Sequence, residues 1–123
     1  GPGTHATTFG MNPVCCAGAN AVLDILENGV LNEVNDKGAY LRKKIESFNS
    51  PYVKGTRGKG MMIGIIIDGV APKELAGKMI ASGLLVLTAG SDAIRLLPPL
   101  TITYQEMDRG LEIMKKVLCG GGE

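Results

Sequence analysis

The chain has 123 residues, of which 45% are apolar and 20% charged, and its formal net charge is +1. This length is sufficient for one domain with one hydrophobic core, and the composition excludes a disordered chain. The near-neutral charge gives no electrostatic reason to expect a nucleic acid or an anionic membrane surface as a partner.

Neither a membrane anchor nor a metal site is expected from the sequence. The longest uninterrupted apolar stretch lies around residues 61–67 and is far too short to cross a bilayer, and no secretory leader is visible. Cys15, Cys16 and Cys119 lack the spacing of zinc ligands or of a redox pair. We therefore expect buried, reduced thiols in a cytoplasmic protein.

The first predicted element is a helix that follows a Gly- and Thr-rich opening, residues 1–10. Asn12-Pro13 predicts the helix start, with asparagine as N-cap and proline at the first helical position, and Gly29 predicts the end. The early turns, residues 14–19, are small and apolar on every side. Because such a helix is normally covered all round, we expect this one to lack its neighbour.

A second helix is predicted from about Asn32 to the break at residues 49–51. Its apolar stripe comprises Val34, Leu41, Ile45 and Phe48. Its charged residues, Lys37 among them, are expected on a solvated face rather than in a nucleic-acid patch.

Two hairpins and two further helices complete the predicted order. The expected strands are 52–54, 61–67, 84–87 and 93–97, with a hairpin turn at 58–60, a helix between Pro72 and Gly83, and a last helix that starts in a capping box of Thr103 and Glu106. Because the strands come in hairpins and not in βαβ crossovers, the order predicts an α+β fold. We expect a small antiparallel sheet with helices packed on one face.

Arg95 is the most informative residue of this pattern. It lies within the apolar strand Ala93-Ile94-Arg95-Leu96-Leu97, which Pro98-Pro99 ends. A guanidinium cannot lose its charge there, and leaving it desolvated without a partner costs several kcal/mol. Arg95 therefore reaches solvent, pairs with an internal carboxylate, or awaits an anion from outside.

The remaining motifs are better explained by turns. Gly55-Thr56-Arg57-Gly58 matches the GxxG loop of an RNA-binding KH domain, but that loop joins two helices and this one lies between strands. His5 is the only histidine and has no carboxylate or thiol at a ligand-like spacing, so no catalytic triad and no metal centre is predicted.

Three blocks of the sequence, in order, resemble class III pyridoxal-phosphate-dependent aminotransferases. They are residues 3–13, which include Thr7-Thr8-Phe9-Gly10; residues 57–64, which read Arg-Gly-Lys-Gly-Met-Met-Ile-Gly; and residues 83–102, which include Ile94-Arg95-Leu96-Leu97-Pro98-Pro99. Within that family the last block looks most like the acetylornithine aminotransferases, with ornithine and 4-aminobutyrate aminotransferases as close relatives.

The resemblance implies the C-terminal small domain of a fold-type I aminotransferase, an α+β unit. It implies a linker or interface segment at residues 1–12, the small domain at 13–119 and a flexible tail at 120–123. The implied partners are amino and keto acids, the enzyme's own large domain and a second subunit of a cytoplasmic homodimer, with no nucleic acid and no membrane. The implied pathway is arginine biosynthesis.

The resemblance also implies roles for three residues. Thr8 is similar to the threonine that reaches across a dimer interface to the phosphate of pyridoxal phosphate, with Thr7 beside it. Arg95 matches the arginine that holds a substrate carboxylate, that of glutamate or 2-oxoglutarate, with a bidentate fork. The family usually has two glycines before Asn-Pro, whereas the second position here is Met11. If that position requires a positive φ, methionine strains the loop.

Two parts of the family's machinery are expected upstream of this chain: the lysine that binds the cofactor covalently and the acidic partner of the pyridine nitrogen. No lysine here matches that position, so we expect an excised C-terminal domain that is inactive alone, binds no cofactor covalently and holds no catalytic residue. The alternatives are a stand-alone, non-catalytic α+β module for ligand binding or dimerisation, and, less favoured, a compact RNA-binding domain.

Overall fold

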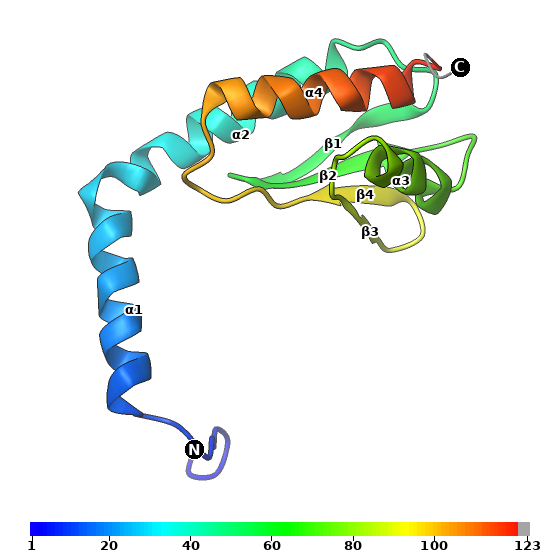
Figure 1. Ribbon diagram of the computed structural model, residues 1–123. Helices are drawn as coiled ribbons and strands as arrows, with labels where there is room; N and C mark the ends of the chain where they lie inside the picture. Colours follow the sequence, from blue (N-terminus) through cyan, green and yellow to red (C-terminus); the bar gives the residue numbers. More distant parts are fainter. Residues whose placement is uncertain (121–123) are drawn as a thin grey trace. The chain divides into compact units, whose positions relative to one another are not determined.

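The computed structural model describes residues 1–120, so residues 121–123 of the predicted tail at 120–123 lie outside the described residues. The chain forms two compact units, Gly1–Leu31 and a second unit that starts at Asn32. Figure 1 labels the helices and strands of both units.

The first unit is built around helix α1, Pro13–Ile25. Asn12 caps it as predicted, because its side-chain Oδ1 accepts hydrogen bonds from the backbone N–H groups of Val14 (3.0 Å) and Cys15 (3.3 Å). The helix passes into a wider, irregular turn, Leu26–Val30, where Gly29 has a φ of +119°. Gly29 thus interrupts the regular helix at the predicted place, since only glycine adopts this conformation readily.

No residue of α1 is buried. By length and composition alone, the helical run Pro13–Glu46 is apolar enough to cross a membrane, although polar residues divide the apolar stretch and the irregular turn interrupts the helix. The sequence did not predict this run, because its polar residues leave no long uninterrupted apolar stretch. A helix with this composition needs an apolar cover of some kind.

The second unit contains a four-stranded antiparallel sheet with strand order β1-β2-β4-β3. The strands are β1 Val53–Lys59, β2 Met62–Ile67, β3 Leu87–Ala89 and β4 Ala93–Leu96. Both predicted hairpins are present. In the first, residues 58 and 59 belong to β1, so the turn is at residues 60–61 rather than 58–60. The third strand begins at Leu87 and not at Leu84, because residues 84–86 still lead the chain away from the preceding helix.

Three helices, α2 Leu31–Glu46, α3 Pro72–Ala81 and α4 Tyr104–Leu118, supply the apolar cover of this sheet. Alternation along β2 buries Ile63, Ile65 and Ile67 on one face, and register places Ile94 and Leu96 of β4 on that same face. The helices add to this core the buried residues Leu41, Ile45, Leu75, Met79, Met107, Leu111, Met114 and Leu118. Each fully buried side chain of this size stabilises the fold by roughly 1.5–3 kcal/mol. Figure 1 shows α2 and α4 lying along the sheet. The α+β prediction is confirmed.

Helix α2 touches the tip of the first hairpin at backbone distance. A Cβ added at Gly38 would lie 2.1 Å from the carbonyl oxygen of Gly60, so only glycine allows this packing. Arg42 secures the same oxygen with a hydrogen bond of 3.2 Å from its Nη1. The hairpin that pairs with β4 is therefore held firmly against α2.

Candidate functional site

Arg95 lies in the middle of β4, where it pairs with Gly64 of β2 on one side and with Leu87 of β3 on the other. Its neighbours Ile94 and Leu96 point into the core, so the Arg95 side chain stands on the opposite face of the sheet. The residue is half-buried. The sheet therefore presents a guanidinium at its centre, on the face that the helices do not cover.

The Arg95 side chain has no partner among residues 1–120. Its Nε is buried without any hydrogen-bond partner, and none of the ion pairs in this part of the chain includes it. Arg95 therefore pairs with no carboxylate among the described residues. Because its Nε is buried, the guanidinium is also not fully solvated. A buried charged donor without a partner is strongly unfavourable. The geometry suits a carboxylate that arrives from outside and accepts two parallel N–H bonds.

A second arginine lies in the same row of the sheet. Arg57 of β1 pairs with Gly64, which in turn pairs with Arg95. Arg57 donates two hydrogen bonds to Asp92, from Nη1 to Oδ2 (3.0 Å) and from Nη2 to Oδ1 (2.9 Å). These contacts hold the pKa of the Asp92 carboxyl below its usual value, mainly through the side-chain hydrogen bonds.

Sequence reasoning missed the Arg57–Asp92 pair because it assigned Arg57 to turn chemistry. The pair is separated by 35 positions, and no local spacing indicates it. The only usable signal was the pair of predicted hairpins. With the correct register between them, the contact between Arg57 and Asp92 could have been predicted.

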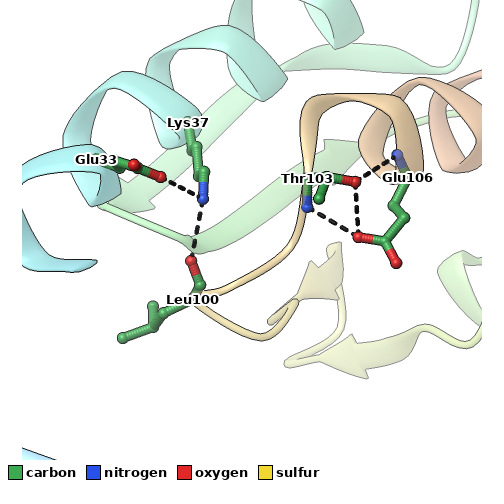
Figure 2. A network of polar contacts seen from close by, with 5 residues as sticks. All are labelled: Glu33, Lys37, Leu100, Thr103 and Glu106. Atoms are coloured by element: carbon green, nitrogen blue, oxygen red, sulfur yellow. Dashed lines mark hydrogen bonds and ion pairs between the residues drawn. The ribbon is translucent and has the colours of Figure 1, made fainter. Parts of the chain in front are cut away.

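The segment that follows β4 is fixed by a buried lysine (Figure 2). Lys37 of α2 donates to the backbone oxygen of Leu100 (Nζ to O 3.3 Å) and forms an ion pair with Glu33 (Nζ to Oε2 2.7 Å). The side chain of Lys37 is only 6% exposed, so its predicted place on a solvated face is wrong. Its aliphatic stem packs inward while its amine finds polar partners at the helix edge.

The start of α4, after the same segment, is closed by the predicted capping box (Figure 2). The backbone N–H and the hydroxyl of Thr103 each donate to Oε2 of Glu106 at 2.8 Å, and the Glu106 backbone N–H donates to the Thr103 hydroxyl at 3.2 Å. The backbone hydrogen bond is the main reason that the pKa of Glu106 lies below its usual value.

An apolar cavity of about 330 Å³ lies on the helix side of the sheet. Its walls come from the end of β4, from residues 97–99 that follow it, from residues 84–85 and from α4. Arg95 does not line this cavity, so the charged site and the cavity are separate features.

Thr7 and Thr8 belong to the first unit and lie in the exposed turns that precede α1. The backbone carbonyl oxygen of Thr7 accepts a hydrogen bond from the backbone N–H of Gly10 (3.4 Å). The carbonyl oxygen of Phe9 accepts one from the N–H of Asn12 (3.2 Å). A Cβ at Gly10 would lie 2.5 Å from Cγ2 of Thr7, so glycine allows the two turns to close. Met11 has a positive φ of +62°. The strain that was predicted for a methionine with a positive φ at this position therefore applies.

These turns fit the phosphate group that the resemblance implies. Neither threonine hydroxyl is engaged in the side-chain hydrogen bonds found among residues 1–120, where the nearest such bond joins Thr4 to Gly1. Hydroxyl groups with free donors, beside the backbone N–H groups of a tight turn, are suitable ligands for a phosphate.

The cysteines and His5 form no site in the part of the chain described. Cys15, Cys16 and Cys119 are all exposed, so the expectation of buried thiols is wrong. Cys15 and Cys16 lie in α1, none of whose residues is buried, and Cys119 follows the last residue of α4. Within residues 1–120 no group of three His, Cys, Asp or Glu residues could hold a metal ion.

Comparison with known proteins finds a family model, described as aminotransferase class-III, that matches residues 1–118. The chain is 44% identical over 120 residues to the acetylornithine aminotransferase of Bacillus subtilis, covering 96% of this chain and 31% of that protein. It is 36% identical over 118 residues to the ornithine aminotransferase of Brevibacillus brevis, covering 95% and 29%. The chain thus spans about a third of the length of these curated relatives.

Solved structures agree with these relatives. The ornithine aminotransferase of Toxoplasma gondii superposes with a TM-score of 0.86 at 28% identity and covers 98% of this chain and 30% of its own. The acetylornithine aminotransferase of Elizabethkingia anophelis gives a TM-score of 0.84 at 31% identity and covers 96% and 33%.

Proposed function

Since the chain belongs to the class-III aminotransferase family, we propose that it is the C-terminal small domain of a pyridoxal-phosphate-dependent aminotransferase. The proposed reaction moves an amino group between N-acetylornithine, or a related ω-amino acid, and 2-oxoglutarate, in arginine biosynthesis in the cytoplasm. The named relatives support this choice of substrates. The observation that carries the proposal is the unpartnered guanidinium of Arg95 in a sheet whose other charged groups are paired or exposed.

Arg95 is the proposed binding residue for the carboxylate of glutamate or 2-oxoglutarate. Its position between β2 and β3 fixes the backbone on both sides, so the planar fork faces the ligand with little freedom to lose. Lysine supplies a point charge and cannot form two parallel hydrogen bonds in one plane.

The test replaces Arg95 in the longer enzyme. Arg95→Lys should raise the KM for 2-oxoglutarate and for glutamate by roughly tenfold or more, because one good hydrogen bond to a charged group is lost. Arg109→Lys, an exposed arginine of α4, is the matched control and should leave both values unchanged. Unaltered kinetics in Arg95→Lys with an intact fold would refute the role.

Thr8, with Thr7 beside it, is the proposed ligand of the cofactor phosphate, in the segment 1–12 that we assign to the subunit interface. Pyridoxal phosphate, when bound, supplies the electron sink that the transfer of an amino group requires. The contribution of this chain is to hold the phosphate by hydroxyl and backbone donors, and to hold the substrate carboxylate by Arg95.

This chain by itself should not catalyse the reaction. None of its lysines matches the position of the lysine that binds the cofactor covalently in the family. After incubation with pyridoxal phosphate and dialysis, we expect no retained visible absorbance, and a retained band would contradict the assignment of that lysine to another part of the protein.

A further inference from the structure

We infer that Arg57 is a positioning residue: by holding both oxygens of Asp92, it keeps that carboxylate from pairing with Arg95 and leaves the Arg95 guanidinium open to a substrate carboxylate. The inference deepens the proposed function, because it rests on Arg95 as the carboxylate-binding residue.

The first step is that the two arginines share one face. In the antiparallel ladder Arg57 pairs with Gly64 and Gly64 with Arg95, so these residues form one row across three strands. Paired residues of neighbouring strands point to the same side, and two strand spacings separate the two arginine backbones by about 10 Å. Both side chains therefore stand above the same patch of sheet, on the face that the core does not use.

The second step is that Asp92 is the acidic residue nearest to Arg95 in sequence and that it reaches the face of the sheet on which Arg95 lies. It directly precedes β4 and lies three positions before Arg95, nearer in sequence than any other acidic residue. Its side chain reaches the face of the two arginines, because it meets the guanidinium of Arg57 there. A free carboxylate at this place is a ready internal partner for Arg95.

The third step is that the pair with Arg57 engages both oxygens of this acid. Both terminal nitrogens of Arg57 are used, one on each carboxylate oxygen, which is the fork geometry of the strongest ion pairs. Gly64 allows it: a Cβ there would lie 3.2 Å from Cγ of Arg57, so the absence of a side chain lets Arg57 cross β2 toward Asp92. The result is one neutral pair and one unpaired cation on the same face.

The direct test follows the Nε–H signal of Arg95 by NMR in the 123-residue chain labelled with ¹⁵N-arginine, between pH 6 and pH 3, with the signal assigned from the Arg95→Lys spectrum. In the unmodified chain the Arg95 signal should not move with the titration of Asp92. In Arg57→Gln it should move with that titration, because Asp92 then pairs with Arg95. In Arg57→Gln/Asp92→Asn the movement should disappear.

Two results would overturn the inference. One is an Arg95 signal in Arg57→Gln that follows the unmodified curve. The other is a movement that persists in the double variant, since another acid would then be responsible. If Arg57→Gln does not fold, Arg57→Lys replaces it: a single ammonium engages Asp92 less completely, so a smaller movement of the same signal is expected, and none would contradict the inference.

The kinetic test uses the longer enzyme and separates the two proposals. Arg57→Gln should raise the KM for 2-oxoglutarate by roughly three- to tenfold, with a smaller effect on kcat, and adding Asp92→Asn should restore it. A purely structural role for Arg57 would not be rescued by removing its partner. If Arg95→Lys leaves KM unchanged while the NMR result holds, the function of Arg95 is wrong but the sequestration of Asp92 stands.

Discussion

The two arginines on the uncovered face of the sheet differ in what their guanidinium groups meet. Arg57 is fully paired with Asp92, whereas Arg95 has a buried Nε without a partner in the described residues. Only strand alternation separates the two arginines from the core. In β4 it places Ile94 and Leu96 on the core face and Arg95 on the other. A single position in a strand thus decides between a core residue and a residue on the uncovered face.

Residues 7–11 include the proposed ligands of the cofactor phosphate, and single substitutions there test that proposal. In the longer enzyme, Thr8→Val should weaken binding of pyridoxal phosphate because a hydroxyl donor is lost, and Thr8→Ser should not.

Met11→Gly removes a positive-φ cost of about 1–2 kcal/mol, offset by about 0.5–1 kcal/mol of backbone entropy, so the affinity for pyridoxal phosphate should rise slightly. Absorbance titration with the cofactor measures all three, and equal affinities for Thr8→Val and Thr8→Ser would refute the hydroxyl contact.

At the scale of secondary-structure elements, the polar contacts of Figure 2 hold the segment that follows β4 and the start of α4. The capping box was predictable because its two residues are three positions apart and their spacing alone defines the motif. Lys37 was not predictable, because its partner Leu100 lies 63 positions away and only the packing of α2 brings the two together.

Lys37 should contribute to stability through both its amine and its stem. We expect Lys37→Met to lower the free energy of unfolding by about 1 kcal/mol, because the Leu100 carbonyl and Glu33 lose their partner, and Lys37→Ala to lower it further, because buried methylenes are lost. Urea unfolding measures both, with the exposed Lys115→Met as control. A Met variant as stable as the unmodified chain would show that the amine contributes nothing.

The cap of α4 makes stability depend on pH in one direction. Because the folded state lowers the pKa of Glu106, its contribution is present above about pH 4.5 and is lost as the pH falls through the lowered value. The stability difference between the unmodified chain and Glu106→Gln should therefore shrink between pH 6 and pH 3. Glu112→Gln, on the same helix, is the control, and a constant difference for Glu106→Gln would contradict the prediction.

At the scale of the whole molecule, α1 leaves apolar side chains in water. Val14 is 80% exposed and Val22, Leu23 and Ile25 are each more than half exposed. We propose that the enzyme's large domain or its second subunit covers this helix.

This chain alone should therefore self-associate through α1. Sedimentation velocity at increasing concentration should show growing species, and Val22→Glu should reduce them because a charge resists burial in the contact. A single monomer peak at high concentration would contradict this use of α1.

The sequence predicted the fold well because local signals agreed with one another. Asn12-Pro13, Pro72 and Thr103 mark helix starts where the helices begin, and the apolar run after Gly60 is the central strand. It failed where distant residues decide the outcome. The partner of Arg57, the burial of Lys37 and the exposure of the cysteines all depend on which element packs against which.

The register of β4 has a consequence for how such a domain can vary. The turn between β3 and β4 is three residues long, and β2 pairs with β4 immediately after it. If one residue of that turn is deleted and the connection keeps its three residues, the pairing of β4 shifts by one position, which exchanges inside and outside along the strand and sends the guanidinium among the isoleucines. Insertions and deletions should therefore be tolerated there only in pairs, so the length of an unremarkable loop is itself under chemical constraint.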